Sequence, residues 1–226
     1  VHTIAGWFAF GVLLNLGPRI GKYNEDGTAN EIEGHSLVSS FIGLLMLIVG
    51  FFGFLGGCLI WAGADLGGWI NIYGAPATLS SFAFNTLMGL SGGMIGAFWY
   101  SKGNPFWMMS GGLAGIFICA GGLDIWYPGF AFVLGVFGGI VIIPENNWLH
   151  NTFKIDDCVG AVSVHGVAGI LGVLMVGIFA SGYPASGDIP PTSFVGQLVG
   201  VITMIALGFI PGYVISLVMK SMGWLR

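Results

Sequence analysis

The sequence predicts an integral membrane protein built entirely from α-helices. Three observations support this fold class: charged residues make up 7% of the 226-residue chain, hydrophobic residues make up 55%, and the apolar residues form long continuous runs. An ordinary soluble domain has roughly 25% charged residues, so most of this chain's surface must contact lipid. The runs lack the apolar–polar alternation over about ten residues that a lipid-facing β-barrel requires, which favours helices.

Seven apolar segments are candidates for membrane spans, because about 20 helical residues cross a hydrocarbon layer roughly 30 Å thick. The predicted spans are residues 1–18, 38–63, 78–101, 105–123, 127–145, 158–181 and 193–220. Short loops separate them, with turn residues such as Gly17-Pro18 and Pro190-Pro191. Small residues four positions apart recur within the spans and predict closely packed helices; these pairs are Gly53/Gly57, Gly89/Gly93, Gly111/Gly115, Gly135/Gly139 and Gly196/Gly200.

The basic residues predict the orientation of the chain, because Lys and Arg gather in cytoplasmic loops. All six follow alternate spans: Arg19, Lys22, Lys102, Lys154, Lys220 and Arg226. The intervening loops, near Asp65, Asp124 and Asp188, contain none. The sequence therefore predicts that the C-terminus is cytoplasmic and that these three acidic loops face outward.

The sequence gives little indication of nucleic-acid binding, metal binding or catalysis. No basic run indicates a nucleic-acid surface or a polybasic lipid-binding segment. Cys58, Cys119 and Cys158 lie at no metal-ligand spacing, so we expect buried small residues, with no zinc site, disulfide framework or cofactor. No catalytic nucleophile, metal cluster or phosphate-binding loop is visible, and we do not expect an enzyme.

Histidines are the ionisable side chains of most interest. His165 lies about eight residues into the sixth predicted span, near the membrane centre, where an ionisable group is costly. This favours a pore or proton-relay role over a core histidine that is hydrogen-bonded to a neighbouring helix. For His2, position alone predicts a residue in an unstructured chain end. His35 and His150 are expected to be solvated loop residues without a functional role.

Two further features have structural explanations at this level. Asp156 and Asp157 stand where the sixth span begins, and carboxylates in that position cap a helix and suit its dipole. Phe54 falls at a helical spacing that is typical of ordinary packing, so its position alone does not predict a gate.

Three motifs resemble the Amt/Mep/Rh family of ammonium transporters. They are Leu16-Gly-Pro-Arg-Ile-Gly-Lys, Gly53-Phe-Leu-Gly-Gly, and Lys154-Ile-Asp-Asp-Cys-Val-Gly-Ala-Val-Ser-Val-His-Gly-Val-Ala-Gly. The third is the most specific, because it combines an Asp pair that opens a helix with a histidine eight residues later. The resemblance implies an eleven-helix bundle made of two inverted five-helix repeats and a last long helix, assembled as a homotrimer with one pore in each subunit. This chain would supply the last seven helices, as a fragment of a longer protein.

The resemblance also implies a pore site. His2 and His165, one from each repeat, would form a hydrogen-bonded pair at the centre of the pore and relay protons. The two-repeat design gives His2 a reason to face the midplane. Phe54 would be a gate. Phe51 and Cys58 would line the outer ammonium vestibule at positions where transporters usually have tryptophan and serine. Because phenylalanine offers a weaker cation–π face and a thiol is a weaker acceptor, we expect capture of ammonium to suffer.

Two functions follow as alternatives. In the first, the chain belongs to a transporter that recruits ammonium, removes its proton near the histidines and conducts ammonia through the bilayer. In the second, it belongs to a membrane ammonium sensor that binds ammonium with little or no transport and acts on a cytoplasmic signalling or regulatory partner. The vestibule substitutions, together with Leu55 in place of a common asparagine, fit the second. In either case we expect a multi-pass protein of the plasma or inner membrane.

Overall fold

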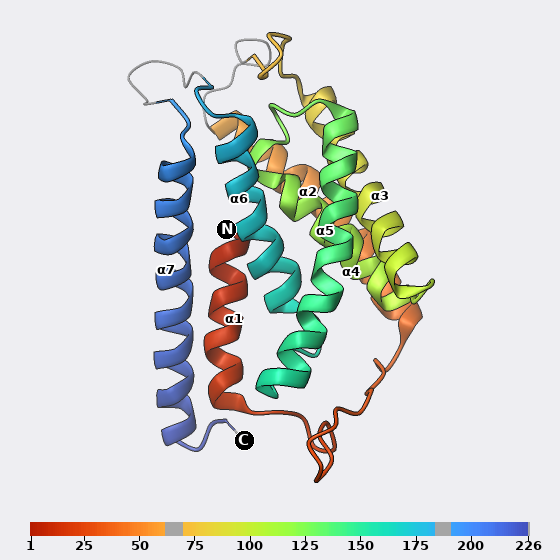
Figure 1. Cartoon of the computed structure of the whole chain (residues 1–226), viewed down its shortest axis with the longest axis vertical. Coiled ribbons are helices and arrows are strands. Elements are labelled where there is room, and N and C mark those ends of the chain that lie inside the picture. Colours follow the sequence, from red (N-terminus) through yellow and green to blue (C-terminus); the bar gives the residue numbers. More distant parts are fainter. Residues whose placement is uncertain (62–69, 184–190, 226) are drawn as a thin grey trace.

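The computed structural model describes residues 1–61, 70–183 and 191–225, and its regular elements there are all helical (Figure 1). In chain order they are α1 (His2–Leu16), α2 (Leu37–Trp61), α3 (Leu79–Ser101), α4 (Pro105–Cys119), the 3-10 helix η1 (Ala120–Gly122), α5 (Pro128–Trp148), the π-helices η2 (Leu149–Phe153) and η3 (Val162–Val167), α6 (Ala168–Phe179) and α7 (Phe194–Ser221). The all-helical fold class is thereby confirmed.

Five helical segments of the described chain are long and apolar enough to cross a membrane. They are Leu37–Cys58, Pro105–Gly122, Pro128–Phe153, Val162–Phe179 and Phe194–Ser221. Helix α1 is shorter, with 15 residues, and α3 is not among the five. The arrangement of seven spans therefore stays a prediction. The N-terminus lies about midway along the long axis of the molecule, whereas the C-terminus lies at one end (Figure 1).

Polar caps explain where several helices begin. The side chain of Thr78 accepts from the backbone N–H of Ser81, whose hydroxyl accepts in return from the N–H of Thr78, and this capping box starts α3. At α4, Asn104 accepts from the backbone of Phe106 and Trp107 immediately before a proline that suits the first helical turn. These starts lie within one residue of the predicted ones.

The sixth predicted span begins later than expected. Residues 158–160 form a turn instead of the first helical residues, with the N–H of Gly160 donating to the carbonyl of Asp157. Gly160 has φ +71°, a left-handed conformation that glycine adopts without strain. The helical segment therefore starts near Val162, and Asp157 caps it from outside.

Three helices, α3, α4 and α5, cross through glycine contacts. A Cβ on Gly93 of α3 would lie 2.0 Å from the carbonyl oxygen of Gly111 on α4, and a Cβ on Gly139 of α5 would lie 2.1 Å from the carbonyl of Gly93. Gly89, Gly115 and Gly135 form a second layer of the same kind. Only glycine lets these backbones approach so closely, so the predicted close packing is confirmed for these three helices.

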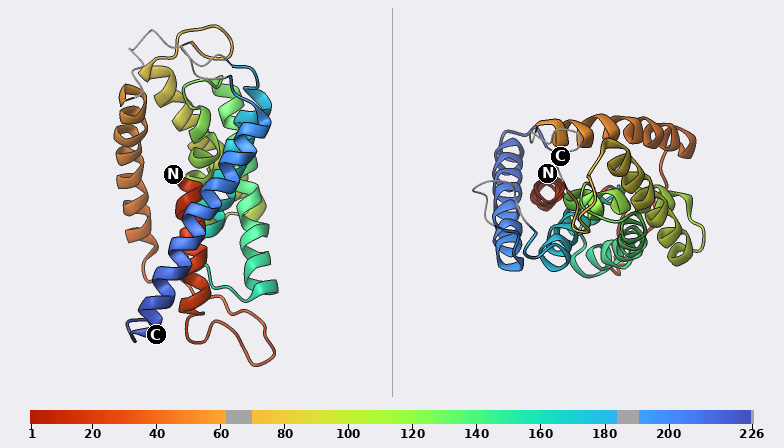
Figure 2. Two further views of the ribbon diagram at one scale, coloured as in Figure 1. Left: turned by 90° about the vertical axis from the view of Figure 1, so that its left-hand side faces the viewer. Right: turned by 90° about the horizontal axis from the view of Figure 1, so that it is seen from above.

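Two other pairs make no backbone contact of this kind within the described chain. In the described part of the chain, a Cβ at Gly53 or Gly57 on α2 would meet no heavy atom within 4 Å, and at Gly196 or Gly200 it would meet only side chains of the neighbouring turns. Helix α2 lies along the edge of the bundle (Figure 2), and most of its membrane-crossing length is exposed. Spacing alone cannot distinguish a helix crossing from an outer face.

The environments of Cys58, Cys158 and His150 also differ from the predicted ones. Of the cysteines, only Cys119 is buried, whereas Cys58 and Cys158 are exposed. His35 is exposed as expected, but His150 lies in η2 with its Nε2 buried. The chain continues helically past the predicted end of the fifth span, and this brings His150 inward.

Several basic residues gather at the end of the molecule that holds the C-terminus. Lys154 donates to the carbonyl of Gly27 at 2.6 Å, and Lys220 donates to the carbonyl of Asn15 at 2.7 Å. This common end agrees with the predicted clustering of the basic loops. Asp65, Asp188 and Arg226, which entered the orientation prediction, lie outside the described residues.

Candidate functional site

His2 and His165 lie side by side although 163 residues separate them. Their Nδ1 atoms are 3.1 Å apart and their ring centroids 5.3 Å apart. A hydrogen bond between two Nδ1 atoms requires one protonated and one unprotonated nitrogen, so the two imidazoles hold complementary tautomers. His2 is the first residue of α1, and His165 is the fourth residue of η3.

Glycines allow the two histidine-bearing elements to touch. A Cβ on Gly6 would lie 2.1 Å from the backbone nitrogen of Gly166, and a Cβ on Gly169 would lie 2.8 Å from the backbone nitrogen of Thr3. The backbones of α1 and of η3 with α6 are therefore in direct contact on either side of the histidine pair. A methyl group at Gly6 would force the elements apart and lengthen the distance between the rings.

Asp157 caps the first residues of the π-helix η3. The carboxylate accepts from the backbone N–H groups of Ala161 at 2.7 Å and Val162 at 2.8 Å, and Asn146 donates to the hydroxyl of Ser163 at 3.1 Å. Burial raises the pKa of Asp157 above its ordinary value, although the backbone donors favour its charged form. The capping role predicted for this residue is confirmed, and π-helical turns are frequent at functional sites.

The neighbouring Asp156 ties the segment before η3 to the segment after α1. Arg19 donates to its two carboxylate oxygens from Nε at 2.8 Å and Nη2 at 2.9 Å, and its backbone N–H adds a third bond. Burial opposes ionisation of Asp156, but these bonds hold its pKa below the ordinary value. Two adjacent carboxylates thus fix the end of α1 and the start of η3, the elements that carry the histidines.

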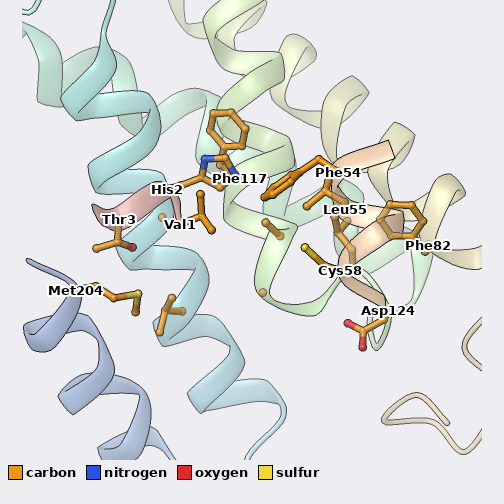
Figure 3. A pocket seen from close by; sticks show the side chains of 15 residues that line it. Val1, His2, Thr3, Phe54, Leu55, Cys58, Phe82, Phe117, Asp124 and Met204 are labelled. Carbon is orange, nitrogen blue, oxygen red and sulfur yellow. The ribbon is translucent and has the colours of Figure 1, made fainter. Parts of the chain in front are cut away.

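The predicted gate and vestibule residues form a stripe on α2. Cys58 and Phe54 line a cavity of about 300 Å³ whose wall also contains His2 (Figure 3). Phe51, two helical turns from Cys58, is in edge-to-face arrangement with His2 at a centroid distance of 6.3 Å. Phe51 thus contacts His2, whereas Phe54 and Cys58 line the cavity.

Phe117 on α4 is the site residue that the sequence analysis missed. Its ring stacks on His2 at a centroid distance of 3.7 Å and on His165 at 4.5 Å, and it meets the ring of Phe51 edge to face at 5.3 Å. The side chain is almost fully buried and lines the cavity. It stands in an apolar, glycine-rich helix, where nothing in the sequence distinguishes it from an ordinary core phenylalanine.

The cavity is lined by residues of six α-helices, the 3-10 helix η1 and the loop that follows η1. Its remaining wall is mostly apolar, and the residues described there besides His2, Phe54, Cys58 and Phe117 are Val1, Thr3, Leu55, Phe82, Ala120, Gly121, Leu123, Asp124, Gly169, Val173 and Met204. Figure 3 shows Asp124 beside Cys58 and apart from His2. The cavity thus extends from Asp124 to His2.

Comparison with known proteins identifies the family of the chain. The model of the Ammonium Transporter Family matches residues 1–226. The chain is 33% identical to ammonium transporter Amt1 of Haloferax mediterranei over 210 residues, covering 89% of this chain and 39% of the relative. It is 30% identical to ammonium transporter Amt2 of Methanocaldococcus jannaschii over 227 residues, covering all of this chain and 50% of the relative. The chain spans half or less of the length of these two relatives.

Solved structures share the fold over the whole chain. A structure described as a sensor Amt protein has a TM-score of 0.83 and 31% identity, covering all of this chain and 54% of that one. Mep2 of Candida albicans has a TM-score of 0.78 and 22% identity, with coverage of 100% and 50%; at this identity the match concerns the fold alone. With the family match spanning every residue, this chain belongs to the ammonium transporter family.

Proposed function

We propose that this chain forms the histidine-bearing part of an ammonium pathway, in which ammonium gives up a proton and ammonia crosses the membrane. Members of the ammonium transporter family are transporters, not enzymes. The observation that carries the proposal is the His2–His165 hydrogen bond at the wall of a largely apolar cavity.

The chemistry follows from the cost of burying a charge. An ammonium ion is strongly penalised in an apolar cavity, whereas ammonia is small and neutral. In the tautomer in which His2 donates through Nδ1, its Nε2 carries a lone pair, and within the described structure that atom is buried without a hydrogen-bond partner. Transfer of a proton from ammonium to Nε2 would release ammonia and leave a positively charged imidazole. The bond to His165 offers the proton a separate route onward.

This mechanism also accounts for selectivity. Potassium has no proton to give up, so it would have to enter the cavity as a desolvated ion. Phe54 would gate entry to the cavity, and Phe51 and Cys58 would contribute to ammonium capture. The replacement of the usual tryptophan and serine by Phe51 and Cys58 predicts modest affinity.

A membrane ammonium sensor is the second candidate. It is favoured by the 31% identity to a structure described as a sensor Amt protein and by the weakened vestibule at Phe51 and Cys58. A sensor would bind ammonium at the same site and pass the occupied state to a cytoplasmic signalling partner, with little net transport.

The orientation, oligomeric state and number of membrane spans are also part of the proposal. The clustered basic loops support a cytoplasmic C-terminus, and the family resemblance supports a homotrimer in the plasma or inner membrane. The predicted arrangement of seven spans, which would complete the last part of an eleven-helix core, belongs to the same proposal.

The deciding experiment places the complete protein in proteoliposomes and records current after an ammonium jump, with a potassium jump as control. Binding of ammonium is measured in parallel by calorimetry. Selective current supports transport, binding without current supports sensing, and the absence of both contradicts the proposed function.

A further inference from the structure

Phe117 occupies a position that neither the predicted gate nor the histidine pair explains. It stacks on both imidazoles, at interplanar angles of 21° to His2 and 28° to His165, and its face covers the hydrogen-bonded pair. A centroid distance of 3.7 Å is van der Waals contact, so no molecule fits between this ring and His2.

The ring also marks the end of the cavity. Both His2 and Phe117 belong to the described wall, whereas His165 does not. Phe117 both lines the cavity and stacks on His165, so its ring covers a face of His165 on the side of the cavity. Figure 3 shows Phe117 next to His2 and away from the end of the cavity at Cys58 and Asp124.

The surroundings of Phe117 hold it in place. Its neighbours on α4, Ile116 and Ile118, are fully buried, and the ring of Phe51 rests edge-on against it. Movement of the ring therefore requires either a rotamer change in a packed environment or a displacement of α2.

We propose that Phe117 is an inner gate that closes the cavity toward His165 and slows passage of ammonia beyond His2. The proposal rests on the ammonium pathway proposed above and deepens it. Two effects act together: the ring blocks the path, and its negative face stabilises a positively charged imidazole, which retains the proton on the pair. Slow passage with retained binding is the behaviour that a sensor requires.

The test compares Phe117→Ala and Phe117→Leu with the unmodified complete protein in proteoliposomes. Phe117→Ala removes the ring from the path. Because a lower barrier to passage raises the rate, we expect the initial ammonium current to rise about tenfold. Phe117→Leu keeps most of the volume but removes the aromatic face, and we expect a smaller rise. Phe130→Ala is the matched control, because Phe130 packs in the core against Phe179 and Trp126, away from the histidines.

The outcomes separate the two proposals. Folding is verified by monodispersity and by thermal unfolding in detergent, and Phe117→Leu serves as the test if Phe117→Ala does not fold. Current equal to that of the unmodified protein in a folded Phe117 variant overturns the inner gate, as does an equal rise in Phe130→Ala. If the unmodified protein and all variants neither bind nor conduct ammonium, the ammonium pathway itself is wrong, and the gate falls with it.

Discussion

The two sides of the candidate site are built differently. His2 and His165 stand on elements whose backbones touch through Gly6, Gly166 and Gly169, so their separation is set by main-chain contact. The facing helix α2 meets the site through side chains, with Phe51 in ring contact and Gly53 in open space. We call the first the rigid side, because backbone contact fixes the histidine distance, and the second the adjustable side, because its contact within the described chain is made by side chains.

Gly6→Ala is expected to have the largest effect, because the new methyl group would meet the backbone of η3 at 2.1 Å. Overpacking of this kind costs about 3 kcal/mol and should separate the imidazoles, with loss of ammonium binding or current. Thermal unfolding and calorimetry measure both effects. Gly53→Ala on α2 is the control and should change neither; an equal loss there would remove the distinction between the two sides.

His165→Ala tests the chemistry of the rigid side without disturbing its backbone. We expect ammonium current or its selectivity over potassium to fall about 100-fold, because a positioned proton acceptor is lost, while the protein stays assembled. His35→Ala, in an exposed loop, should behave like the unmodified protein. Normal selective current in His165→Ala would exclude His165 from the mechanism.

Asp156→Asn tests how the rigid side is fixed at its end. Loss of the paired bonds from Arg19 should lower the free energy of unfolding by about 2 kcal/mol. Since the folded-state pKa of Asp156 is lowered, its contribution is present above its ordinary pKa and disappears as the pH falls through the lowered value. Unfolding curves recorded at decreasing pH should therefore converge for the two proteins. Glu33→Gln, at an exposed carboxylate, is the control and should unfold like the unmodified protein at each pH. A stability difference between Asp156→Asn and the unmodified protein that stays constant as the pH falls would contradict the role assigned to Asp156.

Cys58→Ser is expected to have the smallest effect and acts on the adjustable side. A hydroxyl is a better acceptor than a thiol, so ammonium should bind a few-fold more tightly, by about 1 kcal/mol or less, with unchanged thermal stability. Calorimetry measures the affinity. Cys158→Ser, exposed and outside the described wall of the cavity, should leave it unchanged. An equal change in both variants would show that Cys58 does not contribute through the cavity.

Much of the helical organisation could be predicted because it depends on local composition. Long apolar runs, the caps at Thr78 and Asn104, and the carboxylate of Asp157 act within a few residues of their own position. The start of η3 was predicted less well, because a turn at Gly160 and a π-helical segment compete with a regular helix by small energies.

The sequence by itself determined a membrane-embedded helical chain, its family, and the two histidines that matter most for its proposed chemistry. Only the tertiary structure decided which glycines touch another backbone, that His150 turns inward, and that Phe117 covers both imidazoles. These features depend on which helix faces are brought together by residues far apart in the chain. A phenylalanine in an apolar helix has the same local pattern whether it packs in a core or closes a cavity, and only the position of its neighbours distinguishes the two.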